Sequence, residues 1–175
     1  METLRLIKPT SEYADQIAGY RQAFLAAGDS MDGTGSLVRM EDPVEWLQQC
    51  EDLQHEETVP DGWVPSTQYI CIRESDDRLV GMIQIRHRFN AFLEKYAGHI
   101  GYSIRPGERR KGYATEMLRL ALPFCRELGL KKVLISCEPW NIGSEKTILH
   151  NGGVYESTVY LPDEDIYLKR HWITL

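Results

Sequence analysis

The sequence has few cysteines and no arrangement of them that would form a disulfide framework or a metal site. Only four occur among 175 residues, and none belongs to a C-x-x-C pair or has a nearby histidine at metal-binding spacing. We therefore expect no bound metal, and we expect the four cysteines to be reduced thiols in the core: Cys50, Cys71, Cys125 and Cys137.

A membrane span is missing as well, because no apolar run approaches the length needed to cross a bilayer. The N-terminal stretch METLRLIKPT lacks the apolar core of a signal peptide, which favours a cytoplasmic protein without a membrane partner. Positive charge is scarce too, since 20 Lys and Arg against 26 Asp and Glu give a net charge of -6. Nucleic acid is therefore an unfavourable partner, because its binding depends on neutralising phosphates.

The chain contains none of the phosphate loops of common nucleotide-binding proteins. There is no G-x-x-x-x-G-K-[ST], and no G-x-G-x-x-G near a first strand, which excludes the ATP and NAD sites built on those loops. No helix with Lys-Ser or Lys-Thr follows the glycine-rich segment 28–36, so we interpret that segment as a plain loop. The absence of G-x-S-x-G argues against a covalent intermediate on serine.

What the sequence does contain is a series of short strands and amphipathic helices. The apolar patterns predict strands at 4–8, 67–73, 79–89, 99–104, 131–137, 154–160 and 166–172, and helices at 11–27, 43–53, 113–128 and 144–150. We expect loops at 55–66 and 90–98, and a kink or an early 3₁₀ turn at Pro123. This order indicates a single α/β or α+β domain, residues 1–175, with a mixed sheet.

Segment 99–128 places a basic turn between a predicted strand and a predicted helix. A helix start offers unpaired N–H groups and the positive end of the dipole, and Gly112 lets an anion approach without a Cβ in the way. Three cations, Arg109, Arg110 and Lys111, add charge, so the turn is suited to a diphosphate. Taken alone, such a turn is equally typical of solvated surface.

Two motifs in succession resemble the GNAT superfamily of N-acetyltransferases. The first is R-x-x-G-x-A at Arg109, Gly112 and Ala114, which follows an I-x-P strand end and is similar to the superfamily's acyl-CoA-binding motif. The second is N-x-x-S at Asn141 and Ser144, which is followed by a helix and a glycine pair and is similar to the superfamily's next element. The resemblance is close over residues 79–155 and weak before them.

The resemblance implies a single-domain GNAT fold, with a mixed central sheet of about six to seven strands and helices on both faces. It also implies acetyl-CoA as co-substrate and direct attack by a primary amine. A small-molecule acceptor is favoured, with an aminoglycoside-like polycation and a protein amine left open. The implied donor-binding residues are Ile104, Arg109, Arg110, Lys111, Gly112, Tyr113, Ala114, Thr115, Asn141 and Ser144.

The sequence indicates the catalytic residues less clearly, because Ile148 stands where many family members carry a tyrosine that protonates the leaving thiolate. Ser144 is a candidate replacement, although a hydroxyl at a helix N-terminus is also common for structural reasons. Glu138 and Tyr102 are the candidates for the general base, acting directly or through water. His99 is disfavoured, because it has the opposite parity to Tyr102 along its strand.

Two other functions stay open at this point. The missing tyrosine makes a non-catalytic acyl-CoA-binding or sensing domain a credible alternative. An interaction module whose basic turn binds some other anion is less favoured, because Asn141 and its helix match the family pattern. A homodimer contact through the tail 169–175 is also open, and three aromatic residues are candidates to line an acceptor pocket: Trp63, Trp140 and Tyr155.

Overall fold

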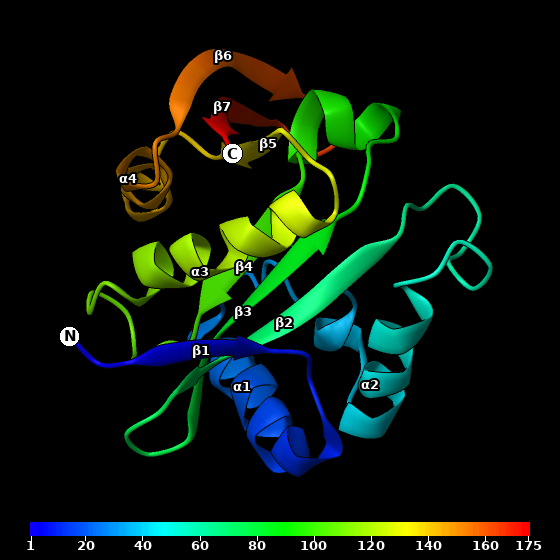
Figure 1. Ribbon diagram of the computed structural model, residues 1–175, viewed down its shortest axis with the longest axis vertical. Helices are drawn as coiled ribbons and strands as arrows, with labels where there is room; N and C mark the ends of the chain where they lie inside the picture. Colours follow the sequence, from blue (N-terminus) through cyan, green and yellow to red (C-terminus); the bar gives the residue numbers. More distant parts are fainter.

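The computed structural model describes residues 1–175 and contains seven strands and four α-helices (Figure 1). The strands are β1 Leu4–Ile7, β2 Ser66–Arg73, β3 Arg78–Arg86, β4 Ile100–Ile104, β5 Lys132–Cys137, β6 Val154–Leu161 and β7 Ile166–Thr174. The helices are α1 Ala14–Ala27, α2 Pro43–Asp52, α3 Tyr113–Glu127 and α4 Ile142–His150. The predicted order of elements is confirmed. None of the helices combines the length and the apolar character that crossing a bilayer requires.

The fold class is confirmed, with one difference in how the strands pair. They form a four-stranded sheet in the order β1-β2-β3-β4 and a three-stranded sheet in the order β5-β7-β6, and all pairs within these sheets are antiparallel. A single mixed sheet would require β4 to pair along β5. The two sheets instead meet beside the start of β4, where the N–H of His99 donates to the Leu134 carbonyl at 2.8 Å. Beyond this junction a gap separates β4 from β5.

Helices cover both faces of the four-stranded sheet, because alternate side chains of β2 and β3 enter two different cores. Figure 1 shows α1 and α2 on one face and α3 on the other. Ile70 and Met82 pack with α1 and α2, whereas Cys71 and Ile83 pack with α3. This explains why both strands are apolar along most of their length. All four cysteines are buried and free, as expected of core thiols.

One local prediction is wrong, and a second is wrong in part. Segment 90–98 was expected to be a loop, but Leu93–Ala97 forms a π-helical turn. The Asn90 side chain accepts a hydrogen bond from the Leu93 N–H at 2.8 Å, and this bond starts the turn. A pattern of hydrophobic residues does not reveal such a bond. At Pro123 the expected 3₁₀ turn is absent, because α3 continues as α-helix around it, and the alternative expectation of a kink stays a prediction. Pro123 is exposed, so water can bond the carbonyl that its missing N–H leaves free.

His99 lies at the junction of the two sheets. Its Nδ1 accepts the N–H of Leu134 at 2.9 Å, and its ring centroid lies 4.0 Å from that of Phe89. Burial and, to a smaller extent, the nearby charge of Arg86 lower the pKa of His99 from 6.5 to about 4. The imidazole therefore stays neutral at neutral pH and remains able to accept this hydrogen bond.

We expect His99 to make the stability of the protein depend on pH. Between pH 6.5 and about 4 the unfolded chain binds a proton at His99 that the folded protein does not, so the free energy of unfolding falls as the pH is lowered. The loss amounts to roughly 3 kcal/mol. Urea unfolding across this range should show a much smaller loss in His99→Asn, whose amide oxygen can still accept the Leu134 N–H.

The matched control for this measurement is His55→Asn, because His55 is exposed. This variant should keep the pH dependence of the wild type. If His99→Asn and the wild type lose stability equally between pH 6.5 and 4, another group is responsible and the prediction is wrong.

Candidate active site

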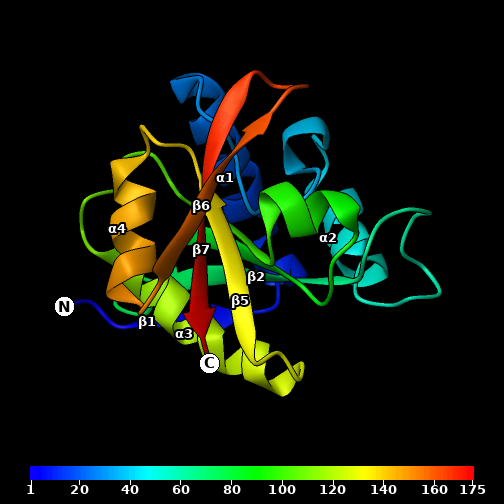
Figure 2. The same cartoon turned by 90° about the horizontal axis from the view of Figure 1, so that it is seen from above.

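A cleft of about 1000 Å³ lies in the gap between the two sheets. One part, which we call the helix half, is lined by β4, by residues 108–110 and Gly112 of the turn before α3, and by the first turns of α3 and α4. The other part, the loop half, is lined by segment 28–36, the π-helical turn, β5 and the β6–β7 loop. Figure 2 shows α4, drawn in orange, and the π-helical turn, drawn in green, on opposite sides of the three-stranded sheet. The two halves thus reach the gap from different sides.

The turn before α3 has the geometry of an anion-binding site. Gly112 has a φ of 80° and precedes the helix without a side-chain cap. A Cβ at Gly112 would meet nothing within 4 Å, so the approach to the helix start is open. The N–H groups at the start of α3 precede the first intrahelical hydrogen bond and are free to donate to a phosphate. Three residues of this first turn line the cleft as predicted: Tyr113, Ala114 and Thr115.

Two of the three cations in the turn line the cleft. Arg109 donates from Nε to the Ile104 carbonyl at 3.1 Å and from NH1 to the Asp29 carboxylate at 2.6 Å. Arg110, with a φ of 63°, is exposed and has no ion-pair partner. Both residues therefore lie at the helix half, where Asp29 balances the charge of Arg109 and no carboxylate of the protein balances that of Arg110.

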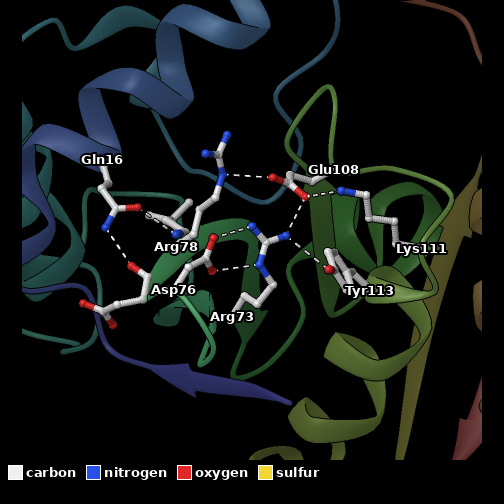
Figure 3. Close-up of polar contacts among 9 residues, drawn as sticks. Gln16, Arg73, Asp76, Arg78, Glu108, Lys111 and Tyr113 are labelled. Atoms are coloured by element: carbon white, nitrogen blue, oxygen red, sulfur yellow. Dashed lines mark hydrogen bonds and ion pairs between the residues drawn. The ribbon is translucent and has the colours of Figure 1, made fainter. Parts of the chain in front are cut away.

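The turn is held in place by the buried carboxylate of Glu108 (Figure 3). It pairs with Arg73 at 2.8 Å, Arg78 at 2.9 Å and Lys111 at 2.7 Å. Burial acts to raise the pKa of Glu108, but Lys111 and Arg73 outweigh it and lower the pKa below its usual value. Arg73 also donates to the Tyr113 hydroxyl at 3.2 Å. Lys111 thus stabilises the turn and does not line the cleft, where a diphosphate contact was predicted for it.

The edge of β4 that faces the gap pairs with no other strand, although the Ile104 carbonyl already accepts a hydrogen bond from Arg109 Nε. In an antiparallel pair the residues that exchange hydrogen bonds alternate with those that do not. The N–H groups of Arg86 and Arg105 make hydrogen bonds at the two ends of the β3–β4 pair. These two bonds show which residues of β4 bond to β3 and which do not. The N–H and C=O groups of Tyr102 and Ile104 therefore point away from β3 and into the gap. This edge can bond an extended ligand, which is the role predicted for Ile104.

Asn141 precedes α4 and lines the helix half of the cleft. Its Oδ1 accepts the N–H of Ser144 at 3.1 Å, so it caps the helix. Its side-chain NH₂ group forms no hydrogen bond within the protein. The cap fixes the orientation of the amide, and the NH₂ group remains available to a ligand or to water.

Tyr102 and Ser144 meet across the gap. Their hydroxyl oxygens are 2.8 Å apart, and the phenol also donates to the main-chain carbonyl of Ser144 at 3.3 Å. Burial raises the pKa of Tyr102 above its usual value, although the hydrogen bond with Ser144 acts in the opposite direction. Tyr102 therefore stays protonated at neutral pH, which suits a proton donor better than a general base.

Glu138 follows β5 and lines the cleft. It directly follows Cys137, the last residue of β5, so it lies where this strand borders the loop half. It is partly exposed and forms no ion pair or hydrogen bond. The structure thus brings three catalytic candidates, Tyr102, Ser144 and Glu138, to one cleft.

The loop half also contains residues that no sequence motif indicated as part of a site. Asp32 and Gly33 of segment 28–36 line it, as does Arg86 at the end of β3. Gly33 has a φ of 70°, and a Cβ there would collide with the main chain of Gly101 in β4. The glycine signal in this segment therefore reflects close packing against β4, and this packing brings Asp32 to the cleft.

The remaining candidates divide between the cleft and other places. Trp140 lines the cleft, whereas Trp63 and Tyr155 do not. Ile148 is fully buried in the core and His99 is buried at the sheet junction, so neither reaches a bound substrate.

Comparisons with known proteins agree with this geometry. The family model described as an acetyltransferase (GNAT) domain matches residues 3–154. The comparison with curated protein sequences finds no match.

Several solved structures share the fold. The ribosomal-protein-S5-alanine acetyltransferase from Vibrio fischeri has a TM-score of 0.72 at 16% identity, covering 99% of this chain and 94% of that chain. Mycobacterium smegmatis RimJ, in complex with CoA-disulfide, has a TM-score of 0.71 at 20% identity, covering 98% and 81%. The dodecameric spermidine N-acetyltransferase from Vibrio cholerae has a TM-score of 0.65 at 15% identity, covering 98% and 93%.

At such identities the solved structures establish a common fold and leave the substrate open. The family match establishes more than the fold, because the matched residues 3–154 include both the turn before α3 and the cap of α4. On this basis the chain belongs to the GNAT family of acetyltransferases.

Proposed function

We propose that the protein transfers an acetyl group from acetyl-CoA to a primary amine by direct attack, and that the acceptor is a small molecule. The observation that carries this proposal is the open helix start at Gly112, which lies at one end of a cleft that also contains a free carboxylate, Glu138. An anionic donor and a basic acceptor can therefore enter the same gap from its two halves.

The helix half has groups for each part of the donor. The N–H groups of the first turn of α3, with Arg109 and Arg110, would hold the diphosphate. The free edge of β4 at Ile104 and the side-chain NH₂ of Asn141 would hold the pantetheine arm. Acetyl-CoA, when bound there, supplies the activated thioester.

The catalytic groups lie at the gap. The acceptor reaches the cleft mostly as an ammonium ion, so a base must remove a proton before its nitrogen can attack the thioester carbonyl. The carboxylate of Glu138 would take this proton, directly or through water. As the carbon–sulfur bond breaks, the phenol of Tyr102 would give its proton to the departing thiolate. The Ser144 hydroxyl, 2.8 Å from the Tyr102 oxygen, would then return a proton from solvent.

Variants of the two catalytic candidates test this mechanism. With acetyl-CoA and a panel of primary amines, we expect Tyr102→Phe to lower kcat about 10- to 100-fold while acetyl-CoA affinity changes little, because the phenol acts on the leaving group. Glu138→Gln should lower kcat/KM for the amine by about 100-fold and weaken its rise with pH, because an amide cannot accept the proton. Turnover is measured by thiol release.

The controls are Tyr167→Phe and Glu127→Gln, which alter exposed residues outside the cleft. Both should keep the activity of the wild type. Wild-type rates and pH profiles in Tyr102→Phe and Glu138→Gln would remove both residues from the mechanism.

A non-catalytic acyl-CoA-binding domain is the second candidate, because the position of the usual family tyrosine holds Ile148, which is fully buried. The amine panel separates the two functions. Binding of acetyl-CoA without acetylation of any amine would support the binding domain and contradict the proposed transfer.

A further inference from the structure

Arg86, the last residue of β3, is a cation in the loop half of the cleft without an anionic partner. It lines the cleft together with Asp32 and Gly33. Its NH1 donates to the main-chain carbonyls of Ala97 and Gly98 at 3.4 and 3.2 Å. No carboxylate forms an ion pair with it. These two carbonyl contacts orient the guanidinium and leave its charge uncompensated.

The lack of a counter-ion is notable because Arg86 is largely withdrawn from solvent. Burial lowers the pKa of Arg86, and the carboxylate of Asp32 offsets this only in part. Arginine nevertheless remains charged at neutral pH. Arg88 lies two residues further on and is exposed, yet it forms a bidentate contact with Glu56, with both distances 3.0 Å. The fold thus pairs the exposed arginine and leaves the one in the cleft unpaired.

The free edge of the Arg86 guanidinium fits a carboxylate. Nε and NH2 form no hydrogen bond within the protein, and neither atom is sealed from solvent. Together they present two parallel N–H donors, the arrangement that binds both oxygens of a carboxylate. Gly101 and Gly33 pack closely beside this guanidinium, since a Cβ on Gly101 would lie 3.3 Å from Gly33 and 3.5 Å from NH2.

The same half of the cleft offers carboxylates for a positive group. Three line it without an ion-pair partner: Asp32, Glu138 and Glu164. Asp29 and Glu108, which also line the cleft, are already paired with cations of the protein. The loop half therefore combines one unpaired cation with several unpaired anions, which suits a ligand that carries both charges.

We propose that Arg86 binds a carboxylate of the acceptor, so that the acceptor is an amine that also carries a carboxylate, such as an amino acid. The inference rests on the proposed function and narrows it. A polyamine would pair with the carboxylates but would leave the Arg86 guanidinium without a counter-ion. A carboxylate supplies the missing counter-ion and directs the amine toward the acidic side of the cleft.

Acceptors compared in pairs test this inference. The pairs are α- and ω-amino acids and their carboxamides, which have the same amine and differ in the anionic group. With wild-type protein and acetyl-CoA, the acid of at least one pair should have a kcat/KM about tenfold or more above that of its amide, mainly through a lower KM. In Arg86→Gln this ratio should fall close to one, while the rate with the amide changes little.

Three controls separate binding of the acceptor from a structural role. Arg88→Gln changes the charge equally at an exposed site and should keep the wild-type ratio. Arg86→Lys keeps a charge without the fork and should retain part of the preference. Calorimetric titration of acetyl-CoA should give the same affinity for wild type and Arg86→Gln.

The outcomes distinguish this inference from the proposed function. Acetylation of amides, or of polyamines, at rates equal to or above those of the acids would overturn the inference and leave the transfer reaction intact. Equal loss of both rates in Arg86→Gln would make Arg86 structural and also overturn it. If acetyl-CoA binds but no amine of any kind is acetylated, the proposed function itself fails. The comparison within wild type stands even if Arg86→Gln does not fold.

Discussion

The Gly112→Asp variant should lose affinity for acetyl-CoA by about 100-fold or more, which corresponds to about 2.7 kcal/mol of binding free energy. The carboxylate would project into the space through which a diphosphate reaches the start of α3, and it would repel the phosphate charges. Folding is not blocked, because nothing lies within 4 Å of the Cβ position. Calorimetric titration of acetyl-CoA and of free CoA measures the loss.

The matched control is Gly107→Asp in the same turn. Gly107 also has a positive φ, of 88°, and open space around its Cβ position, but it does not line the cleft. Gly107→Asp adds the same charge and similar backbone strain, and it should weaken binding by less than about tenfold. If Gly112→Asp binds acetyl-CoA like the wild type, the diphosphate does not lie at this helix start. No binding by the wild type would remove the donor site altogether.

The Gly98→Ala variant should be destabilised by about 3 kcal/mol or more, because two costs combine at one position. Gly98 has a φ of 69°, which is strained for alanine, and its Cβ would collide with the carbonyl of Leu134 in the neighbouring sheet. Neither partner in this contact is a flexible side chain, so relief would require the two sheets to move apart. Urea unfolding measures the free energy, and the yield of folded protein gives a second readout.

The Gly129→Ala variant is the control that separates backbone strain from the steric clash at Gly98. Gly129 has a φ of 82° and nothing within 4 Å of its Cβ position. Its substitution should cost about 1 kcal/mol, the price of the backbone conformation alone. Equal losses in the two variants would show that the sheets adjust freely at Gly98, contrary to the expectation.

The residues of the helix half could be predicted because they are close together in the sequence. The turn residues and the start of α3 are consecutive, and the cap of α4 spans four residues, so spacing alone was informative for Gly112 and Asn141. Lys111 shows the limit of this reasoning. Its positive charge was evident from the sequence. The direction of its side chain depends on Glu108, with which it pairs, and Glu108 in turn pairs with Arg73 at the end of β2.

The loop half was predicted only at Glu138, because its other residues are brought together by the tertiary fold alone. Asp32 reaches the cleft through the packing of Gly33 on Gly101, and Arg86 through the end of β3. The contact between Tyr102 and Ser144 joins residues 42 positions apart. Likewise, the division into two sheets depends on where β4 and β5 stop pairing, which hydrophobic patterns do not encode.

The junction between the two sheets has a consequence for how a ligand enters the cleft. The main chains are linked beside β4 by the contacts around His99 and Leu134, and every other strand pair lies within one sheet or the other. Beyond the junction β4 and β5 are already apart, while one hydrophobic core under α3 holds both sheets together. An extended ligand can therefore enter the gap without breaking a sheet hydrogen bond.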